Sequence, residues 1–321
     1  MVKKDRRPGK IFLNLGGGAA RGFAHIGVLS ALREAQIPFD CLVGVSMGAI
    51  VASVYAVNPD VEYTKDRVVA LALSRKFQES PIGTWTRRTN ESQRSFFQRL
   101  KNLYTNTNLV RRFFLSSGIL EEEQINEVLY PFIPDIAIGT ARIPLYIVAV
   151  DLLSGTSRIF QGKDRLRDAV IASASMPMVF PPRQIEGRFY SDGGVLDKIG
   201  VDAAESLGAE FIIAVDVSDE KLPEARLRSG LDVMLRTEEI ASLYRRQYQL
   251  KRADVVIQPI RGNIHWADYG KYREIMDMGY EATRAKIEEL RHKLKLLNLR
   301  RRFFLGGFST RRTKLRRLLQ G

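Results

Sequence analysis

Histidine and cysteine are scarce in this chain, and each scarcity narrows the chemistry open to it. Cys41 is the one cysteine among 321 residues, so an internal disulfide is excluded, which fits a reducing compartment. A catalytic triad would have to use His25, His265 or His292. The N-terminal region lacks the apolar stretch of a signal peptide, and we therefore expect a cytoplasmic protein.

Long uncharged runs are also rare. Residues 41–59 carry no charge and are long enough to suggest a membrane span. However, Gly44, Ser46 and Gly48 indicate a turn in the first third of this run, and Pro59 closes it. A buried strand, a tight turn and a buried helix account for the same residues, and we favour that interpretation.

Negative charge is outweighed by positive charge, but only at the two ends. The formal net charge is +14, yet residues 291–321 hold 11 Lys/Arg without any Asp/Glu and residues 1–10 carry +4. This distribution describes terminal tails, and nucleic acid is an unlikely partner. Residues 296–321 mix Lys/Arg with Leu and Phe, which favours contact with an anionic membrane surface, at its inner face, over binding of nucleic acid or a protein.

Apolar and amphipathic segments alternate along most of the chain. Strands are expected at 10–15, 39–44, 144–155, 156–160, 187–194, 210–218 and 253–260, and helices at 23–36, 48–57, 166–177, 229–250 and 270–296. The polar, basic residues 60–140 are interpreted as a mostly helical inserted cap. We therefore predict a three-layer α/β/α fold with a mainly parallel central sheet, forming one catalytic domain over 10–295 and a tail over 296–321.

A turn between an expected strand and an expected helix reads Gly-Val-Ser-Met-Gly at residues 44–48. In this context the G-x-S-x-G pattern is typical of a nucleophile whose hydroxyl projects beyond the sheet. Gly44 and Gly48 leave room for neighbouring backbone, and the following helix directs its positive end at the reacting centre. We interpret Ser46 as a nucleophile; the alternative is an apolar turn that contains a serine by chance.

The first expected strand runs into the loop GGGAARG. A dinucleotide fingerprint would need a glycine at Arg21, and the Lys-Ser/Thr ending of a P-loop is missing. Gly16, Gly17 and Gly18 instead present backbone N–H groups that can stabilise an oxyanion, with the charge of Arg21 nearby. Since Ser46 leaves the next strand, both loops should meet at the carboxyl edge of the sheet, which favours an oxyanion hole over a plain βα turn.

A serine needs a base before it becomes a good nucleophile. Asp192 ends an expected strand, and Gly193 and Gly194 let the backbone turn while the carboxylate points inward. Such a carboxylate could take the serine proton directly, although Asp-Gly-Gly alone is more often a β-turn. His265 leaves a triad open as an alternative, whereas His25 is interpreted as loop support.

Four blocks in this order resemble the patatin-like phospholipase family: GGGAARG, GVSMG, ASASMPMVFPP (172–182) and DGGVLDKIGV (192–201). The resemblance covers roughly residues 10–220, and more loosely extends to about 295. It implies a Ser46–Asp192 dyad without a catalytic histidine and an oxyanion loop in GGGAARG. It further implies hydrolysis of acyl esters of phospholipids or lysophospholipids, with neither a metal nor an organic cofactor.

One part of the last block departs from the family pattern. A small polar residue and a proline usually follow Asp-Gly-Gly, whereas this chain has Lys198, Ile199 and Gly200. The departure predicts a looser supporting turn with the catalytic groups retained. An acyltransferase or a triacylglycerol lipase on the same dyad stays open, as does a catalytically idle lipid-binding scaffold.

Overall fold

The computed structural model describes residues 10–79, 122–177, 179–218, 222, 227–262 and 264–301. Within these ranges eight strands form one sheet: β1 (Lys10–Leu15), β2 (Cys41–Val45), β3 (Leu145–Asp151), β4 (Thr156–Phe160), β5 (Arg183–Ile185), β6 (Arg188–Asp192), β7 (Ala209–Val215) and β8 (Val255–Ile257). Their order is β5-β6-β3-β2-β1-β7-β8, and β4 also pairs with β3.

The pairing confirms a mainly parallel sheet. β1 runs parallel to β2 and β7, β2 to β3, and β7 to β8. The antiparallel pairs, β3–β4, β3–β6 and β5–β6, lie at one end of the strand order. Parallel neighbours need long crossover connections, and these connections supply the helices that cover the sheet.

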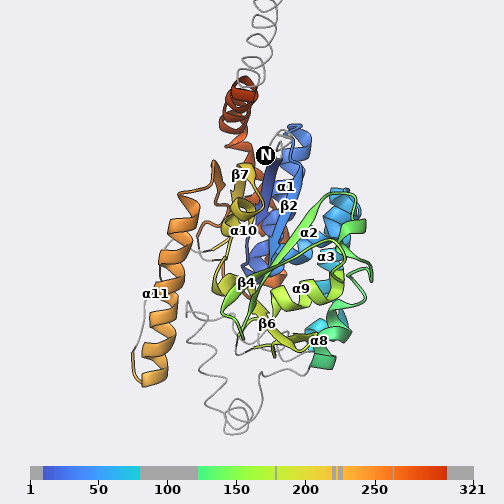
Figure 1. Cartoon of the computed structure of the whole chain (residues 1–321), viewed down its shortest axis with the longest axis vertical. Coiled ribbons are helices and arrows are strands. Elements are labelled where there is room, and N and C mark those ends of the chain that lie inside the picture. Colours follow the sequence, from blue (N-terminus) through green and yellow to red (C-terminus); the bar gives the residue numbers. More distant parts are fainter. Residues whose placement is uncertain are drawn as a thin grey trace, which may run out of the picture.

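Helices lie on both faces of the sheet, which confirms the three-layer α/β/α fold (Figure 1). The larger core includes α1 (Ala24–Glu34), α2 (Met47–Val57), α3 (Val61–Leu73), α9 (Leu166–Ala174) and α12 (Tyr272–Arg284). The smaller core lies under α10 (Val201–Ser206) and the end of α11 (Gly230–Leu250). Shorter elements are α4 (Arg75–Glu79), α8 (Glu122–Leu129) and the 3-10 turns η1 (Ala19–Phe23), η2 (Ile138–Thr140), η3 (Gly193–Val195) and η4 (Tyr269–Lys271).

The uninterrupted apolar strands follow from this layering. Leu13 and Leu15 of β1 belong to the larger core, whereas Phe12, the residue before Leu13, belongs to the smaller one with Val43 and Val45 of β2. Successive side chains of a strand point to opposite faces, so both faces must be covered when every position is apolar. The buried strands thereby hold the ends of β1 and β2 rigidly at one edge.

The run 41–59 forms strand β2, a turn at Ser46 and helix α2. None of the helices in the described ranges is both long enough and apolar enough to cross a bilayer. At the start of the expected insertion 60–140, α3 contributes Val68 and Leu71 to the larger core. That helix is therefore part of the body of the domain, and residues 80–121 of the expected cap lie outside the described residues.

The expected tail begins inside a helix. Residues 287–301 are helical, with Leu290, Leu294 and Leu297 buried against the larger core. Arg301 forms an ion pair with Glu210 at the start of β7, with 2.8 Å between Nη2 and Oε2. Residues 296–301 are thus docked on the domain, and residues 302–321 lie outside the described residues.

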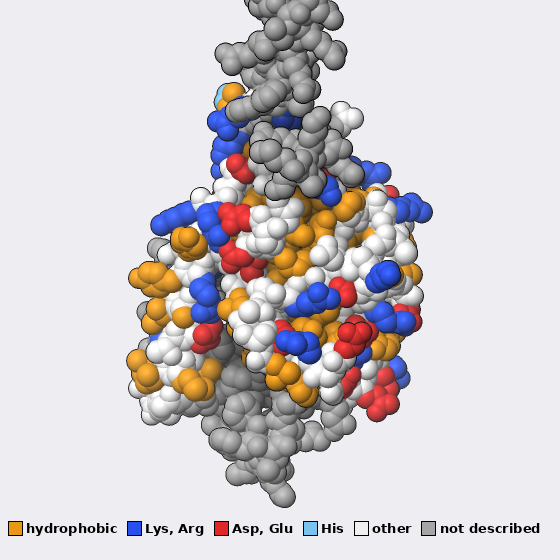
Figure 2. All heavy atoms as spheres, in the orientation of Figure 1, with side chains coloured by type: hydrophobic (Ala, Val, Ile, Leu, Met, Phe, Trp, Pro, Cys, Tyr) orange, Lys and Arg blue, Asp and Glu red, His pale blue; other side chains and the backbone are white. Residues whose placement is uncertain are grey.

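Helix α11 stands at one side of the molecule (Figure 1). Orange side chains gather on the side of the molecule where this helix lies (Figure 2). Its exposed apolar residues include Val233, Met234, Tyr244 and Tyr248. Its inner side carries Arg246, which pairs with buried Asp216 at the end of β7. The helix is therefore anchored by charge and leaves apolar surface facing outward.

Candidate active site

The register of the sheet brings Ser46 and Asp192 together. β2 pairs with β3 as far as Val45, which lies opposite Val148. β4 pairs with one edge of β3. On the other edge β6 pairs with β3 directly beyond β2, so that Asp192 lies opposite the next residue, Ala149. Val45, the residue before Ser46, and Asp192 therefore lie opposite consecutive residues of β3, which brings the two predicted catalytic residues close to each other.

Ser46 occupies a strained backbone position between β2 and α2. Its φ is 54° and its ψ is −122°, a conformation that a residue with a side chain rarely adopts. The flanking glycines make the turn possible: a Cβ on Gly44 would lie 2.5 Å from the Cα of Ala49, and one on Gly48 would lie 1.9 Å from the carbonyl oxygen of Leu15. Both glycines serve close approach between strand and helix.

Two serines at the end of α9 hold both members of the pair. The Ser46 N–H donates to Ser173 Oγ (2.9 Å), and the Ser173 hydroxyl donates to the carbonyl of Val148 (2.6 Å). The carbonyl of Ser175 accepts the N–H of Asp192 (2.9 Å). In the sequence this block marks the family resemblance, and its positioning role was not predicted; the available signal was two hydroxyls in an otherwise apolar segment.

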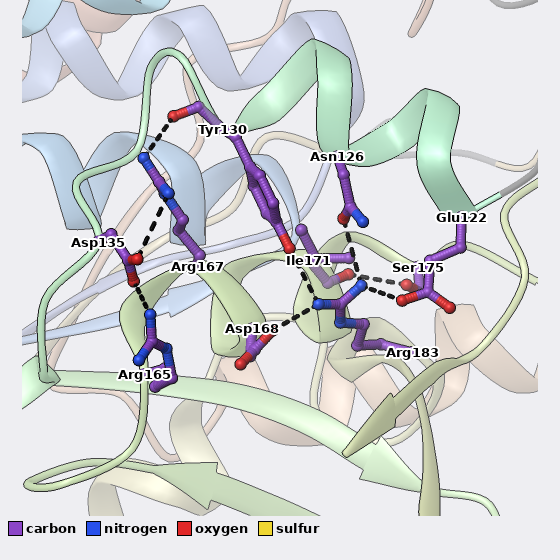
Figure 3. Close-up of polar contacts among 10 residues, drawn as sticks. All are labelled: Glu122, Asn126, Tyr130, Asp135, Arg165, Arg167, Asp168, Ile171, Ser175 and Arg183. Carbon is purple, nitrogen blue, oxygen red and sulfur yellow. Dashed lines mark hydrogen bonds and ion pairs between the residues drawn. The ribbon is translucent and has the colours of Figure 1, made fainter.

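A buried guanidinium fixes the helix that carries these serines. Arg183 of β5 donates to Asp168 of α9 (2.6 Å), to the hydroxyl of Tyr130 (3.1 Å) and to Asn126 of α8 (3.2 Å). It also pairs with Glu122 at the start of α8. Figure 3 shows these groups surrounding the guanidinium, so that α8, α9 and β5 meet at one side chain. Arg183 was not among the residues predicted from the sequence.

The Asp192 carboxyl is buried, and burial raises its pKa above the ordinary carboxyl range. Three smaller effects oppose the rise: a hydrogen bond from the Ser46 side chain, a hydrogen bond from the Gly194 N–H (2.7 Å), and the positive charge of Lys198. A desolvated carboxylate is a stronger base than a solvated one. The arrangement therefore suits proton transfer from a hydroxyl to Asp192.

Two N–H groups of the glycine loop are used within the fold. The Gly16 N–H donates to the carbonyl of Val215 (3.1 Å), and the Gly17 N–H donates to the carbonyl of Lys198 (3.0 Å). These bonds attach the loop to the end of β7 and to the turn after Asp192. They leave neither N–H group available for an oxyanion. Of the three glycines expected to form the oxyanion hole, only Gly18 can therefore contribute its N–H group.

The next two N–H groups of the loop, those of Gly18 and Ala19, have no hydrogen-bond partner within the described ranges. Ala19 has a positive φ of 49°, so the backbone turns sharply here. A Cβ on Gly17 would lie 3.1 Å from the Cβ of Ser46, which places the loop directly beside the serine. Backbone N–H groups without partners, next to a nucleophile, are what an oxyanion requires.

Arg21 lies behind this loop. Its side chain is 8% exposed, and Nε donates to the carbonyl of Ile264 (2.9 Å). The Ala20 N–H donates to the carbonyl of Trp266 (2.8 Å), so the segment before η4 and the glycine loop hold each other. Arg21 thus contributes positive charge near the site while it fastens two loops.

The three histidines occupy different environments. His25 is buried, its Nε2 donates to the carbonyl of Gly16 (2.8 Å), and burial lowers its pKa to about 4, so the ring is neutral and supports the loop. His265 accepts the N–H of Ala267 at Nδ1 (3.2 Å). His292 is exposed on the helix over 287–301. The Ser46 side chain acts on the pKa of the Asp192 carboxyl, which makes this carboxyl the better candidate for the base.

The turn that departs from the family pattern is firmly held, contrary to the looser turn expected. Gly200 has φ of 74°, which a proline cannot adopt, and its carbonyl accepts Asn14 Nδ2 (2.7 Å). Asp197 accepts the N–H of Ala203 at Oδ2 (2.9 Å) and so ties the turn to α10. Glycine in place of proline thus gives a different turn that is closed by buried polar contacts.

A family model for patatin-like phospholipases matches residues 13–205, which include the glycine loop, Ser46 and Asp192. The chain belongs to the patatin-like phospholipase family, a family of lipid acyl hydrolases. This confirms the family predicted from the four sequence blocks.

Related proteins extend the comparison. An uncharacterised NTE family protein of Mycobacterium tuberculosis is 32% identical over 217 residues, which make up 68% of this chain and 51% of that protein. Lysophospholipase NTE1 of Pyricularia oryzae is 29% identical over 221 residues, 66% of this chain and 12% of that protein. The chain spans about half the length of the mycobacterial relative. The crystal structure of VipD from Legionella pneumophila aligns over 88% of this chain and 67% of VipD with a TM-score of 0.51 and 14% identity, which shows likeness of fold.

Proposed function

We propose that this chain hydrolyses acyl esters of phospholipids or lysophospholipids, with Ser46 as nucleophile and Asp192 as base. The observation that carries the proposal is the strained Ser46 turn, whose side chain lowers the pKa of the buried Asp192 carboxyl, beside a loop with two N–H groups that lack a partner in the described ranges. Family membership supports lipid esters as the substrate class. The name of the fungal relative, a lysophospholipase, supports the narrower choice.

The proposed reaction has two halves. Ser46 Oγ attacks the acyl carbonyl while its proton passes to Asp192, and the N–H groups of Gly18 and Ala19 hold the oxyanion. The ester bond then breaks, and Asp192 returns the proton to the departing alcohol. In the second half a water molecule attacks the acyl-serine and gives a proton to Asp192. Asp192 then returns this proton to Ser46 Oγ as the bond between the serine and the acyl group breaks. No group other than substrate and water is consumed.

Product analysis tests the reaction class. The full chain is incubated with a phospholipid, a lysophospholipid and a triacylglycerol, each with and without an added alcohol, and the products are separated by mass spectrometry. We expect free fatty acid from the phospholipid or the lysophospholipid. An ester of the added alcohol as main product would indicate an acyltransferase, release from triacylglycerol alone would indicate a lipase, and no product from any substrate would favour an idle scaffold.

We further propose that the chain meets an anionic membrane surface through its C-terminal residues. Residues 302–321 hold six Lys/Arg and no Asp/Glu, interspersed with Leu and Phe. Ending the chain after Arg301 keeps Leu297 and the ion pair to Glu210. We expect this truncation to abolish sedimentation with anionic vesicles and to spare hydrolysis of a soluble ester. Vesicle binding equal to that of the full chain would refute the proposal, and neutral vesicles provide the control.

A further inference from the structure

Lys198 lies where the glycine loop meets the turn after Asp192. Its carbonyl accepts the N–H of Gly17 (3.0 Å), one residue from the loop's unpartnered N–H groups. A Cβ placed on Gly194 would lie 3.7 Å from Cγ of Lys198 and 3.0 Å from Oδ1 of Asp192. The lysine side chain therefore runs beside the carboxylate of the proposed base.

The Lys198 ammonium has no hydrogen bond and no ion pair within 4.0 Å anywhere in the described ranges. The side chain is nevertheless mostly covered by its neighbours and keeps only partial contact with solvent. Lysine is rarely covered in this way without a partner, because burial of an unpaired charge is costly. Its ammonium is thus a donor of three hydrogen bonds that the described part of the fold does not use.

The other charged groups near Lys198 are already engaged. Asp216 accepts the N–H of Ser218 (3.1 Å) and the amide of Gln258 (3.1 Å), and it pairs with Arg246. Arg21 donates to a loop carbonyl.

Charge around Lys198 is unbalanced toward the positive. The ammonium lies within electrostatic range of Arg21, Arg246, Asp192 and Asp216. Burial lowers the pKa of Lys198, the two arginines lower it further, and the two carboxylates oppose them. Three basic side chains thus face two acidic ones, and an anion bound here would restore the balance.

We propose that Lys198 forms a subsite for the phosphate group of the substrate, an inference that rests on the proposed hydrolysis of lipid esters at Ser46. In a glycerophospholipid or a lysophospholipid, the phosphate is joined to the acyl ester through the short glycerol unit. A cation beside Asp192 therefore lies where the phosphate would arrive when the ester carbonyl reaches Ser46. Charge-assisted hydrogen bonds from an ammonium to phosphate are among the stronger polar contacts.

Two substrates that differ only in phosphate test the subsite. A monoacylglycerol and its phosphate monoester, with the same short acyl chain so that both stay monomeric, are assayed with the wild-type chain and with Lys198→Gln. We expect kcat/KM for the phosphorylated ester to fall about tenfold or more, mainly through KM, because a charged hydrogen bond is lost. Loss of the Lys198 charge also raises the pKa of Asp192 further, so both esters are assayed at a pH well above that pKa, where the neutral ester should change by less than about twofold. Lys198→Arg should keep most of the preference, and Lys163→Gln, at an exposed lysine, serves as the matched control.

Each outcome separates this inference from the proposed function. If the wild-type chain cleaves neither ester, the proposed function fails first. If it cleaves the neutral ester but not the phosphorylated one, or if Lys198→Gln lowers both equally, Lys198 is no phosphate subsite. Should the variant not fold, glycerol phosphate is tested on the wild-type chain: competitive inhibition that glycerol does not reproduce supports the subsite, and its absence overturns it. Equal inhibition by inorganic phosphate would show that the anion alone is recognised, without the glycerol unit.

Discussion

Replacing Ser46 with alanine should abolish both covalent labelling by a fluorophosphonate and ester hydrolysis. The alanine keeps the backbone turn, because both residues carry a Cβ at the same strained φ of 54°. It removes the only group in the proposed reaction that can form the acyl intermediate. Loss of the nucleophile from a catalytic unit of this kind typically costs on the order of 10⁶ in kcat, and the remainder comes from binding and the oxyanion hole.

Ser53→Ala provides a matched control for this experiment. Ser53 lies on the same helix α2, is fully buried, and donates its hydroxyl only to the carbonyl of Ile50. Labelling and hydrolysis should survive that change, and thermal melting should show that both variants fold. If Ser46→Ala were still labelled at one site, the nucleophile would lie elsewhere and the proposed mechanism would fail.

The predictable part of the site is the part held by neighbouring residues. The Ser46 turn could be predicted because Gly44 and Gly48 serve contacts within a few residues of the serine and with the adjacent strand. The central strands could be predicted for a similar reason, since burial of both faces makes them mostly apolar. Their boundaries shifted by a few residues: the helix expected over 166–177 ends at Ala174, where the chain turns to place Ser175.

The contacts that assemble the dyad depend on distant pairing and left little trace in the sequence. Ser173 reaches back 127 residues to the N–H of Ser46, and Arg183 reaches 61 residues to Glu122. A serine in a helix and an arginine in a short strand are ordinary residues. Their positioning roles become visible only in the folded sheet, where β2 and β6 pair with successive parts of β3. Pattern along the chain carries no information about such partners.

The glycine loop shows the same limit at the level of single atoms. Gly16, Gly17 and Gly18 are equivalent as sequence, yet Val215 and Lys198 occupy the N–H groups of the first two. Within the described ranges, the N–H groups that lack a partner are therefore set by the end of β7 and by the turn after Asp192, both about 180–200 residues further along the sequence. Lys198 shows the same limit. From the sequence it was expected only to loosen the turn, whereas in the structure its charged side chain lies beside the proposed base Asp192.

Replacing Asp192 with asparagine should lower activity while it stabilises the fold. Removal of a general base typically costs about 10²–10⁴-fold in rate, and the amide cannot accept the serine proton. Wild-type kcat/KM should fall on acidification through the raised pKa of Asp192, at a higher pH than an ordinary carboxyl would give. The asparagine variant should lack that limb in its residual activity. Because asparagine before Gly193 deamidates readily, the variant is assayed fresh and its mass is checked.

The sign of the stability change follows from the same pKa. A carboxyl whose pKa is raised by folding binds its proton more tightly in the folded state, so the free energy of unfolding decreases as the pH rises from the ordinary carboxyl value through the raised one. Above that range the ionised Asp192 destabilises the fold by about 1.4 kcal/mol for every tenfold decrease in its acid dissociation constant, and asparagine removes this cost. Urea unfolding at acidic and neutral pH should therefore show a smaller pH dependence in the variant.

Asp197→Asn is the matched control, because it separates stability from catalysis. Asp197 is also buried, burial raises its pKa to about 6, and its carboxylate bonds the Ala203 N–H and not the serine. It should likewise reduce the loss of stability between the ordinary carboxyl pKa and about pH 6, while hydrolysis keeps its acid limb. Equal loss of activity in the two variants would mean that the turn, and not the Asp192 carboxylate, limits the rate. Loss of activity in Asp192→Asn alone, together with a gain in stability, would show that the Asp192 carboxylate destabilises the fold and that the reaction depends on its basicity.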